Sequence, residues 1–344
     1  QYVETILEVQ RHNEAFQASG NRIGPLGNCK IQVVCQDESI FHSNDNRLAY
    51  WGEEGGSIIR PKSEGSGLMF SDFLSSDGWL ALPDDVAQKH NVQPSARVLF
   101  EYGKNREGYF TAEAFKAQFK SALDIAEIKY SDCKIYWIGD QSGVHMAWAP
   151  AALRADRLNL GPGGKQPRLR DSVWNGSPFN FQDDSGAPKG LKQILQERGL
   201  WQDNFNKAAA IDCLSQCADF RAEKCEIEML MASRGDRHRW LPIPKFHCEL
   251  NPIELVFAAM KRHARKHCGY SIVGLRKVVP EAAMKIGSSL AAKVFRKTMD
   301  FALAYASRNY NYEAVAILVK KFKSHRKIHG DVADLRSVLS QQPS

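Results

Sequence analysis

The segment from Lys134 to Asp140 constrains the fold of this chain more than any other. It reads Lys-Ile-Tyr-Trp-Ile-Gly-Asp, a nearly continuous apolar run. Such a run is typical of a central strand that is buried on both faces. The strand would deliver Asp140 to its carboxyl end, where open α/β sheets place their sites. A carboxylate at that position is costly unless something binds it.

A second acidic strand end precedes it in the chain. Residues Ile31 to Glu38 read Ile-Gln-Val-Val-Cys-Gln-Asp-Glu, which predicts a short buried strand that finishes in Asp37. Without partner acids, Asp37 and Glu38 would simply be a solvated strand end. Leu68 to Phe73 predicts another strand, and Asp72 within it is an alternative metal ligand. We rank Asp72 lower because the apolar run continues past it, as in a turn or a sheet edge.

A third feature is a helix that begins at Asn251. Asn is a favourable N-cap residue and Pro252 suits the first helical position. Apolar residues then recur at helical spacing, namely Ile253, Val256, Phe257, Met260 and Ala264. Glu254 lies in the first turn, with Lys261 and Arg265 on the same face. Taken alone, Asn251 and Glu254 are most simply a capping box that fixes a helix end.

The other expected elements are mostly helices. A helix beginning at His145 and running through Trp148 is one of them. Further helices are expected over Gln1 to Ala18, Thr111 to Ile125, Gly190 to Arg198, Phe220 to Ser233, Ile272 to Ile286 with an interruption at Pro280, Ala292 to Ser307 and Tyr312 to Phe322. Short strands are expected over Arg97 to Glu101 and Trp240 to Ile243.

These acidic segments together resemble a known family. Asn-Pro-Ile-Glu before an amphipathic helix is similar to the third catalytic block of mariner-type DDE transposases and related integrase-like nucleases, which makes Glu254 the third acid. Asp37-Glu-Ser, followed by a hairpin with Trp51-Gly52, resembles the first block. Asp140, then an amide residue, then His145 five positions later, resembles the second. Close relatives usually carry Asn where this chain has Gln141.

The resemblance implies an α/β, ribonuclease-H-like fold, in which a mixed sheet is flanked by helices. Asp37, Asp140 and Glu254 would be catalytic and would hold two Mg2+ or Mn2+ ions. Hard oxygen ligands suit these cations, and two ions ~4 Å apart can activate a nucleophile and stabilise the leaving oxygen of a phosphodiester. His145 would orient the carboxylates, contact a phosphate or transfer a proton. A satisfied structural His is the plainer alternative.

The resemblance also organises the chain. The second and third acids are separated by residues 141–253, many more than in compact mariner-type domains. The Gly- and Pro-rich middle therefore predicts a loop-rich insertion. A fungal-type, transposon-derived branch of the family shares such an insertion, with phrases that match Leu195 to Trp201 and Gln216 to Phe220. The expected divisions are 1–28 as N-terminal helix and linker, 29–150 as the first part of the catalytic domain, 151–239 as the insertion, 240–268 as its end with the third acid, and 269–344 as a helical, basic C-terminal extension.

Composition agrees with a nucleic-acid partner without requiring one. The formal charge is +7 and hydrophobic residues make up 43% of the chain. No apolar run approaches the ~20 residues of a membrane span, so we expect a soluble, intracellular protein, placed in the nucleus by the resemblance. The eight Cys are spread thinly, and we expect reduced thiols. The spacing of Cys213, Cys217 and Cys225, with His247 and Cys248, does not meet that of zinc ribbons or fingers.

The expected function is a metal-dependent DNA endonuclease and strand transferase. Its partners would be double-stranded DNA, as transposon ends and target, and a second copy in a homodimer. The expected DNA-backbone contacts are Lys245, Lys261, Arg262, Arg265 and Lys266. A terminal basic cluster is a further candidate track, formed by Lys320, Lys321, Lys323, His325, Arg326 and Lys327. Two alternatives stay open: a catalytically inactive transposon-derived DNA-binding or scaffolding protein, and metal-free hydrolysis by an acid–base pair.

Overall fold

The computed structural model describes residues 1–45, 63–308 and 315. The chain divides into two compact units, of which the first comprises residues 1–145 and 231–344 and the second comprises Met146–Leu230. The predicted hairpin with Trp51-Gly52, the helix from Tyr312 and the terminal basic cluster lie outside the described residues.

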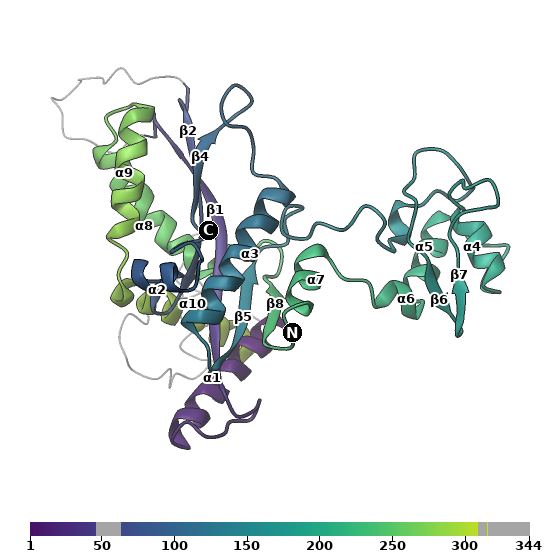
Figure 1. Cartoon of the computed structure of the whole chain (residues 1–344), viewed down its shortest axis with the longest axis horizontal. Coiled ribbons are helices and arrows are strands. Elements are labelled where there is room, and N and C mark those ends of the chain that lie inside the picture. Colours follow the sequence, from purple (N-terminus) through teal and green to yellow (C-terminus); the bar gives the residue numbers. More distant parts are fainter. Residues whose placement is uncertain (46–62, 309–314, 316–344) are drawn as a thin grey trace, which may run out of the picture. The chain divides into compact units, whose positions relative to one another are not determined.

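The first unit is built on a mixed sheet (Figure 1). Its strands are β1 (Lys30–His42), β2 (Gly67–Ser75), β3 (Gly78–Trp79), β4 (Val98–Tyr102), β5 (Cys133–Gly139) and β8 (His238–Pro242). Their order is β3-β2-β1-β5-β8, and β4 also pairs with β2. The pairing of β1 with β2 is antiparallel, whereas β1 with β5 and β5 with β8 are parallel. This is the ribonuclease-H-like arrangement that the sequence predicts.

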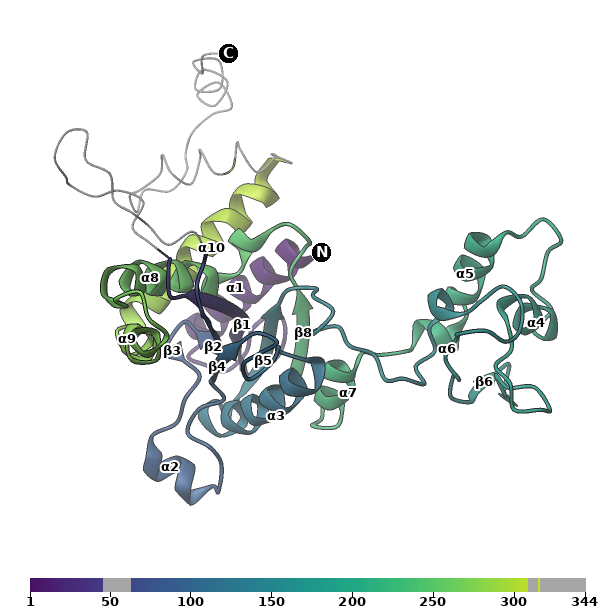
Figure 2. The ribbon, with the colours of Figure 1, turned by 90° about the horizontal axis from the view of Figure 1, so that it is seen from above.

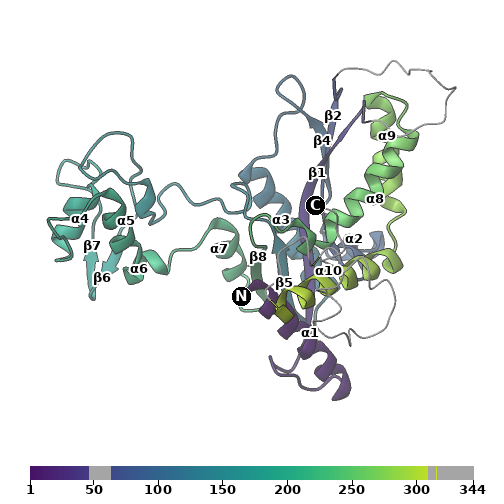
Figure 3. The same cartoon turned by 180° about the vertical axis from the view of Figure 1, so that it is seen from behind.

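Helices cover both faces of this sheet. The helices of this unit include α1 (Tyr2–Ala18), α2 (Asp84–Lys89), α3 (Ala112–Lys129), α8 (Pro252–His267), α9 (Ile272–Met284) and α10 (Ser288–Arg308), with the short η2 (Cys248–Leu250) before α8. Figures 2 and 3 place α3 on one side of the sheet and α8, α9 and α10 on the other. Among the described residues, no helix has both the length and the apolar character needed to cross a membrane.

The side-chain pattern explains the two layers. On the α3 side, Phe119 packs against Trp137 of β5 at a ring-centroid distance of 4.9 Å, and both are fully buried. On the other side, Phe257 of α8 packs against Phe70 of β2 at 6.1 Å. Because β5 is buried on both faces, as its apolar run predicts, helices must cover both sides of the sheet.

Several predicted boundaries need correction. The first strand does not finish at Asp37 but continues to His42, because β2 pairs with it along that whole length. Residues 143–146 form a turn rather than a helix from His145. The helix expected over Phe220 to Ser233 is split into α6 (Ala218–Arg221) and α7 (Glu226–Ala232). Helix α9 runs through Pro280, since the flanking Val279 and Ala283 are buried in one core.

The second unit has its own small core. It contains η1 (Ala155–Arg157), the hairpin β6 (Ser172–Trp174) and β7 (Ser177–Phe179), and the helices α4 (Leu191–Glu197), α5 (Lys207–Ser215) and α6. The predicted insertion covers most of this unit, but residues 231–239 belong to the first unit, and His238 and Arg239 lie in β8.

A buried ion pair connects the two phrases that suggested the branch of the family. Arg198 of the first phrase donates to both carboxylate oxygens of Asp219 in the second, at 3.0 and 2.7 Å. The Arg198 side chain is 0% exposed, and its guanidinium lies 4.6 Å from the Trp174 ring centroid and 4.5 Å from that of Phe179. The segments 195–201 and 216–220 are therefore joined by a buried side-chain contact.

This pair predicts a local loss of stability. Arg198→Ala leaves Asp219 buried without its cation, and breaking a buried pair in this way costs about 3–5 kcal/mol. We expect amide hydrogen exchange in α4, α5 and α6 to accelerate strongly. The exposed Arg221 provides the control, since Arg221→Ala should leave that exchange unchanged. Equal exchange in both variants would contradict a stabilising role for the pair.

Candidate functional site

The first two predicted acids come from neighbouring parallel strands. The pairing of β1 with β5 ends at Cys35 and Ile138. Asp37 and Asp140 each lie two residues beyond this last pair. Strand β1 continues past that point with β2 as its partner, whereas β5 ends at Gly139, so the chain that carries Asp140 leaves the sheet beside Asp37. The parallel register therefore brings together two acids that are distant in sequence.

The third acid approaches from α8. Ile253 and Val256 are fully buried, which fixes the first turn of the helix against β1 and leaves Glu254 on the accessible side. Glu254 and Asp37 affect each other's pKa, so the two carboxyl groups lie close together. All three predicted acids, Asp37, Asp140 and Glu254, thus lie within electrostatic reach of one another, and we call them the carboxylate cluster.

Asn251 does not act as the predicted capping residue. It occupies the N-cap position of α8, but its side chain makes no capping hydrogen bond. Instead Nδ2 donates to Oδ2 of Asp37 at 2.9 Å and to the carbonyl oxygen of Gln36 at 3.3 Å. The buried amide therefore connects the start of the Glu254 helix to the strand that carries Asp37.

The pKa values within the cluster show the cost of bringing these charges together. Burial raises the pKa of Asp37 well above its ordinary value, and the charges of Glu254, Glu38 and Asp140 add to that shift. Partial burial also raises the pKa of Glu254, although this residue is exposed on one side. The positive charge of Lys261 acts in the opposite direction and lowers that pKa. Both shifts indicate a site that favours bound positive charge.

Asp140 differs because a histidine partners it. Burial acts to raise the pKa of Asp140, but contacts with His145 and with the Ser142 N–H outweigh it and hold that pKa below its ordinary value. His145 Nδ1 contacts Asp140 Oδ1, and Nε2 lies 3.3 Å from Glu38 Oε2, an ion-pair contact outside good hydrogen-bond geometry.

His145 is a buried cation rather than an exposed proton donor. Its side chain is 0% exposed and packs against Phe115 at a ring-centroid distance of 4.4 Å. Burial acts to lower the pKa of His145, whereas Asp140 and Glu38 raise it to about 9. The sequence interpretation gave Glu38 no such role. The alternation of side chains along a strand could have indicated this role for Glu38. Because adjacent residues point to opposite faces, Glu38 is directed to the face opposite Asp37.

Asp72 lies across from Asp37 in the sheet but is already paired. Its side chain is 0% exposed, and Arg97 Nε donates to Oδ2 at 2.6 Å. Arg97 in turn lies over the Phe70 and Trp79 rings. Burial raises the pKa of Asp72 to about 6 although Arg97 opposes the shift. This arrangement gives Asp72 a structural pairing and leaves it little freedom to bind a cation.

The cluster has suitable donors for Mg2+ or Mn2+, although its side chains do not surround a single point. Among the described residues, no three His, Cys, Asp or Glu side chains are grouped closely enough to hold a metal ion as they stand. Asp140 is turned toward His145 and Asp37 toward Asn251. The chemistry of the donor set nevertheless fits, since it consists of hard oxygens, and the buried Oδ1 of Asn251 has no hydrogen-bond partner.

The predicted phosphate contacts divide into two groups. Lys245, Arg262 and Lys266 are exposed. Lys261 lies over the Phe41 ring, and its charge reaches Glu254, as the helical spacing predicts. Arg265 is instead engaged, because its Nε donates to both oxygens of Asp45 at 2.9 and 3.0 Å.

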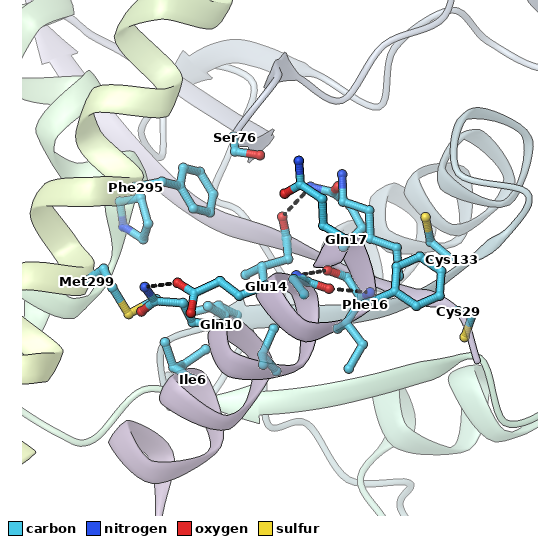
Figure 4. A pocket seen from close by; sticks show the side chains of 18 of the residues that line it. Ile6, Gln10, Glu14, Phe16, Gln17, Cys29, Ser76, Cys133, Phe295 and Met299 are labelled. Atoms are coloured by element: carbon cyan, nitrogen blue, oxygen red, sulfur yellow. Dashed lines mark hydrogen bonds between the residues drawn. The ribbon is translucent and has the colours of Figure 1, made fainter. Parts of the chain in front are cut away.

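A separate cavity lies away from the predicted site residues. A cavity of about 880 Å³ opens between α1, the beginning of β1 and α10. Figure 4 shows Phe295 and Met299 of α10 across from Ile6, Gln10 and Glu14 of α1. None of the predicted site residues lines it. Glu254 is exposed and Asp37 and Asp140 are half-buried, so the carboxylate cluster lies at the protein surface. All eight cysteines are free thiols, as predicted.

Comparison with known proteins gives a limited result. No protein-family model and no curated protein sequence matches this chain. It is similar to a solved structure described as a Mos1 transposase paired-end complex with left transposon end, with 11% identity and a TM-score of 0.44, over 89% of this chain and 63% of that one. It is also similar to a Mos1 mariner paired end complex with Mn, with 12% identity and a TM-score of 0.44, over 88% of this chain and 63% of that one. The chain thus spans less than two thirds of these neighbours.

The Asp72 pKa predicts a specific pH dependence. Its folded pKa of about 6 lies above the ordinary 3.8, so the fold favours the protonated form, and this stabilisation is lost as pH rises through about 6. Asn does not titrate. Between pH 4 and pH 7 we expect the unfolding free energy of the native protein to fall by about 2 kcal/mol relative to Asp72→Asn. Urea unfolding at both pH values measures this difference, and a constant difference would contradict the buried-charge interpretation.

The crowded carboxylates predict a second effect. Because the pKa of Asp37 is raised, its ionised form is destabilising above the ordinary pKa, and Asp37→Asn should stabilise the metal-free protein at pH 8. Added Mg2+ should then stabilise the native protein more than the variant. Thermal unfolding measures both effects. Asp132→Asn, an exposed change just before β5, is the control and should do neither.

Proposed function

We propose that the protein is a metal-dependent DNA endonuclease and strand transferase of the DDE transposase type. One observation carries this proposal: Asp37, Asp140 and Glu254 come from three distant segments and lie within electrostatic reach of one another at the carboxyl edge of the β1–β5 pair. A fold gathers like charges in this way at a cost, which a bound cation offsets.

The carboxylates would hold Mg2+ or Mn2+, two ions in the proposed active form. When bound, such ions activate an attacking water or 3′-hydroxyl and stabilise the leaving oxygen of the phosphodiester. The chain's own residues do the positioning. Asn251 holds Asp37 in place through a 2.9 Å hydrogen bond, and His145 holds Asp140 through its Nδ1. His145 therefore acts here as a buried cation that orients a carboxylate.

Charge distribution supports a DNA partner for the first unit. Residues 146–230 contain equal numbers of basic and acidic residues, so the formal charge of +7 belongs entirely to the rest of the chain. Lys245, Lys261, Arg262 and Lys266 are the proposed contacts to the backbone of double-stranded DNA, whereas Arg265 is already paired with Asp45. Action on transposon ends and target, a homodimer and nuclear location complete the proposal.

The second candidate is a transposon-derived DNA-binding or scaffolding protein without catalysis. The observation that favours it is the present orientation of Asp140 toward His145 and of Asp37 toward Asn251, which leaves no assembled metal group in the described residues. Such a protein would keep the basic surface and would need no metal.

Nicking of labelled duplex DNA separates the two candidates. With Mg2+ or Mn2+ we expect the native protein to nick, and Asp140→Asn to lose at least about a hundredfold in rate, because a proposed metal ligand is removed. Asp132→Asn changes an aspartate just before the opposite end of the same strand and should nick normally. Salt-sensitive binding without nicking at any metal concentration would favour the non-catalytic protein, and nicking in EDTA would favour a metal-free acid–base mechanism.

A further inference from the structure

Two aromatic residues have a backbone conformation that their side chains disfavour. Five non-glycine residues have positive φ among those that the structure describes. Three of them are Asn, which tolerates this region through local hydrogen bonding. The other two are Phe246, with φ of 68°, and Tyr270, with φ of 56°. A bulky residue in this region costs about 1–3 kcal/mol, so its presence calls for a cause.

Neither the turn nor the core accounts for Phe246. The His247 N–H donates to the Pro244 carbonyl oxygen at 3.2 Å, which closes a four-residue turn with Phe246 in its third position. A positive φ at this position favours Gly or Asn. The Phe246 side chain is 99% exposed, so it gains almost nothing from packing. The turn thus holds an exposed apolar ring in a strained backbone conformation.

The turn is attached on both sides to the carboxylate cluster. On its amino side, Ile243 accepts a hydrogen bond of 2.9 Å from Gln141, the neighbour of Asp140. On its carboxyl side, Asn251 contacts Asp37. Between these points lies Cys248, whose pKa is raised by burial and then by the charges of Glu254, Glu249 and Asp37. Phe246 therefore lies in a short segment that is attached at one end to the neighbour of Asp140 and at the other to Asp37.

The segment after the ring is held firmly. Glu249 accepts a 2.7 Å hydrogen bond from the hydroxyl of Tyr305 in α10 and contacts His247 Nδ1 at 2.8 Å. The hydroxyl of Tyr2 in α1 donates to the Leu250 carbonyl oxygen at 3.1 Å. Two helices thus fix the chain that follows the turn, so the ring is mounted on a rigid support.

The residues around the Phe246 ring are suited to a ligand that has both an aromatic face and a negative charge. Phe246 offers a free apolar face, and the adjacent Lys245 is an exposed cation. An unpaired nucleotide has the matching parts, because its base presents a π face and its phosphate a negative charge. A base inside a duplex has both faces covered by its neighbours. On the basis of the proposed function, we propose that Phe246 stacks on an unpaired DNA base next to the cleaved phosphodiester.

Binding of two duplexes in EDTA tests this role without cleavage. One duplex is fully paired, and the other has the same sequence with three unpaired nucleotides at one 3′ end. The native protein should bind the second duplex more tightly than the first. In Phe246→Gly the ratio of the two affinities should fall about tenfold, which corresponds to the loss of one base-stacking contact. Phe246→Trp should retain the preference. Fluorescence anisotropy at several salt concentrations measures it.

Tyr270 provides a matched control. It is an exposed aromatic residue with positive φ just after the other end of α8, and Gly should relieve the same strain there. Tyr270→Gly should leave the preference unchanged, and both Gly variants should melt no lower than the native protein. Lys245→Ala should weaken binding to both duplexes and reduce the salt slope, whereas Phe246→Gly should leave that slope unchanged.

The outcomes distinguish this inference from the proposed function. If Phe246→Gly keeps the full preference while the native protein nicks DNA, the stacking role is wrong and the nuclease stands. If the preference depends on Phe246 but no metal supports nicking, the stacking role stands and the nuclease fails. Equal affinity of the native protein for both duplexes would overturn the stacking role, as would an equal loss in Tyr270→Gly.

Discussion

Electrostatic repulsion among Asp37, Asp140 and Glu254 is the constraint around which the first unit is arranged. Burial and mutual repulsion raise the pKa of Asp37, and the same effects act on Glu254. Such a group persists only because stronger interactions fix the backbone that carries it. The parallel pairing of β1 with β5, the buried first turn of α8 and the Asn251 amide provide that support.

Each acid is fixed by a different kind of partner. Asp37 receives a neutral amide, Asp140 receives the buried cation of His145, and Glu254 has Lys261 within electrostatic reach. These differences separate the pKa values, because Asp140 stays ionised while Asp37 and Glu254 hold protons more readily. Asp72 lies one strand away and has a full partner in Arg97, which is why it belongs to the sheet rather than to the cluster.

The strained turn at Phe246 and the buried pair in the second unit differ in whether a local energetic cost is offset by a partner. Phe246 occupies a disfavoured conformation between two attachments to the cluster, so the fold retains a local cost beside its most costly electrostatic group. In the second unit, by contrast, the buried charge of Arg198 is fully paired with Asp219 and surrounded by aromatic rings. That unit pairs its buried cation with an internal partner, whereas the cluster leaves like charges facing one another.

The sequence by itself determined the buried strand before Asp140 and the helix after Asn251. The mixed sheet followed from the family resemblance, and the site role of the three acids stays a prediction. The apolar run before Asp140 and the helical period after Asn251 depend on local composition, and such patterns survive without knowledge of contacts. Only the tertiary structure decided that β1 continues past Asp37, that Asn251 bonds to Asp37 instead of capping its helix, and that Glu38 joins Asp140 in holding His145. Those outcomes rest on pairings between residues far apart in the chain, and no local pattern specifies which distant partner a polar group will meet.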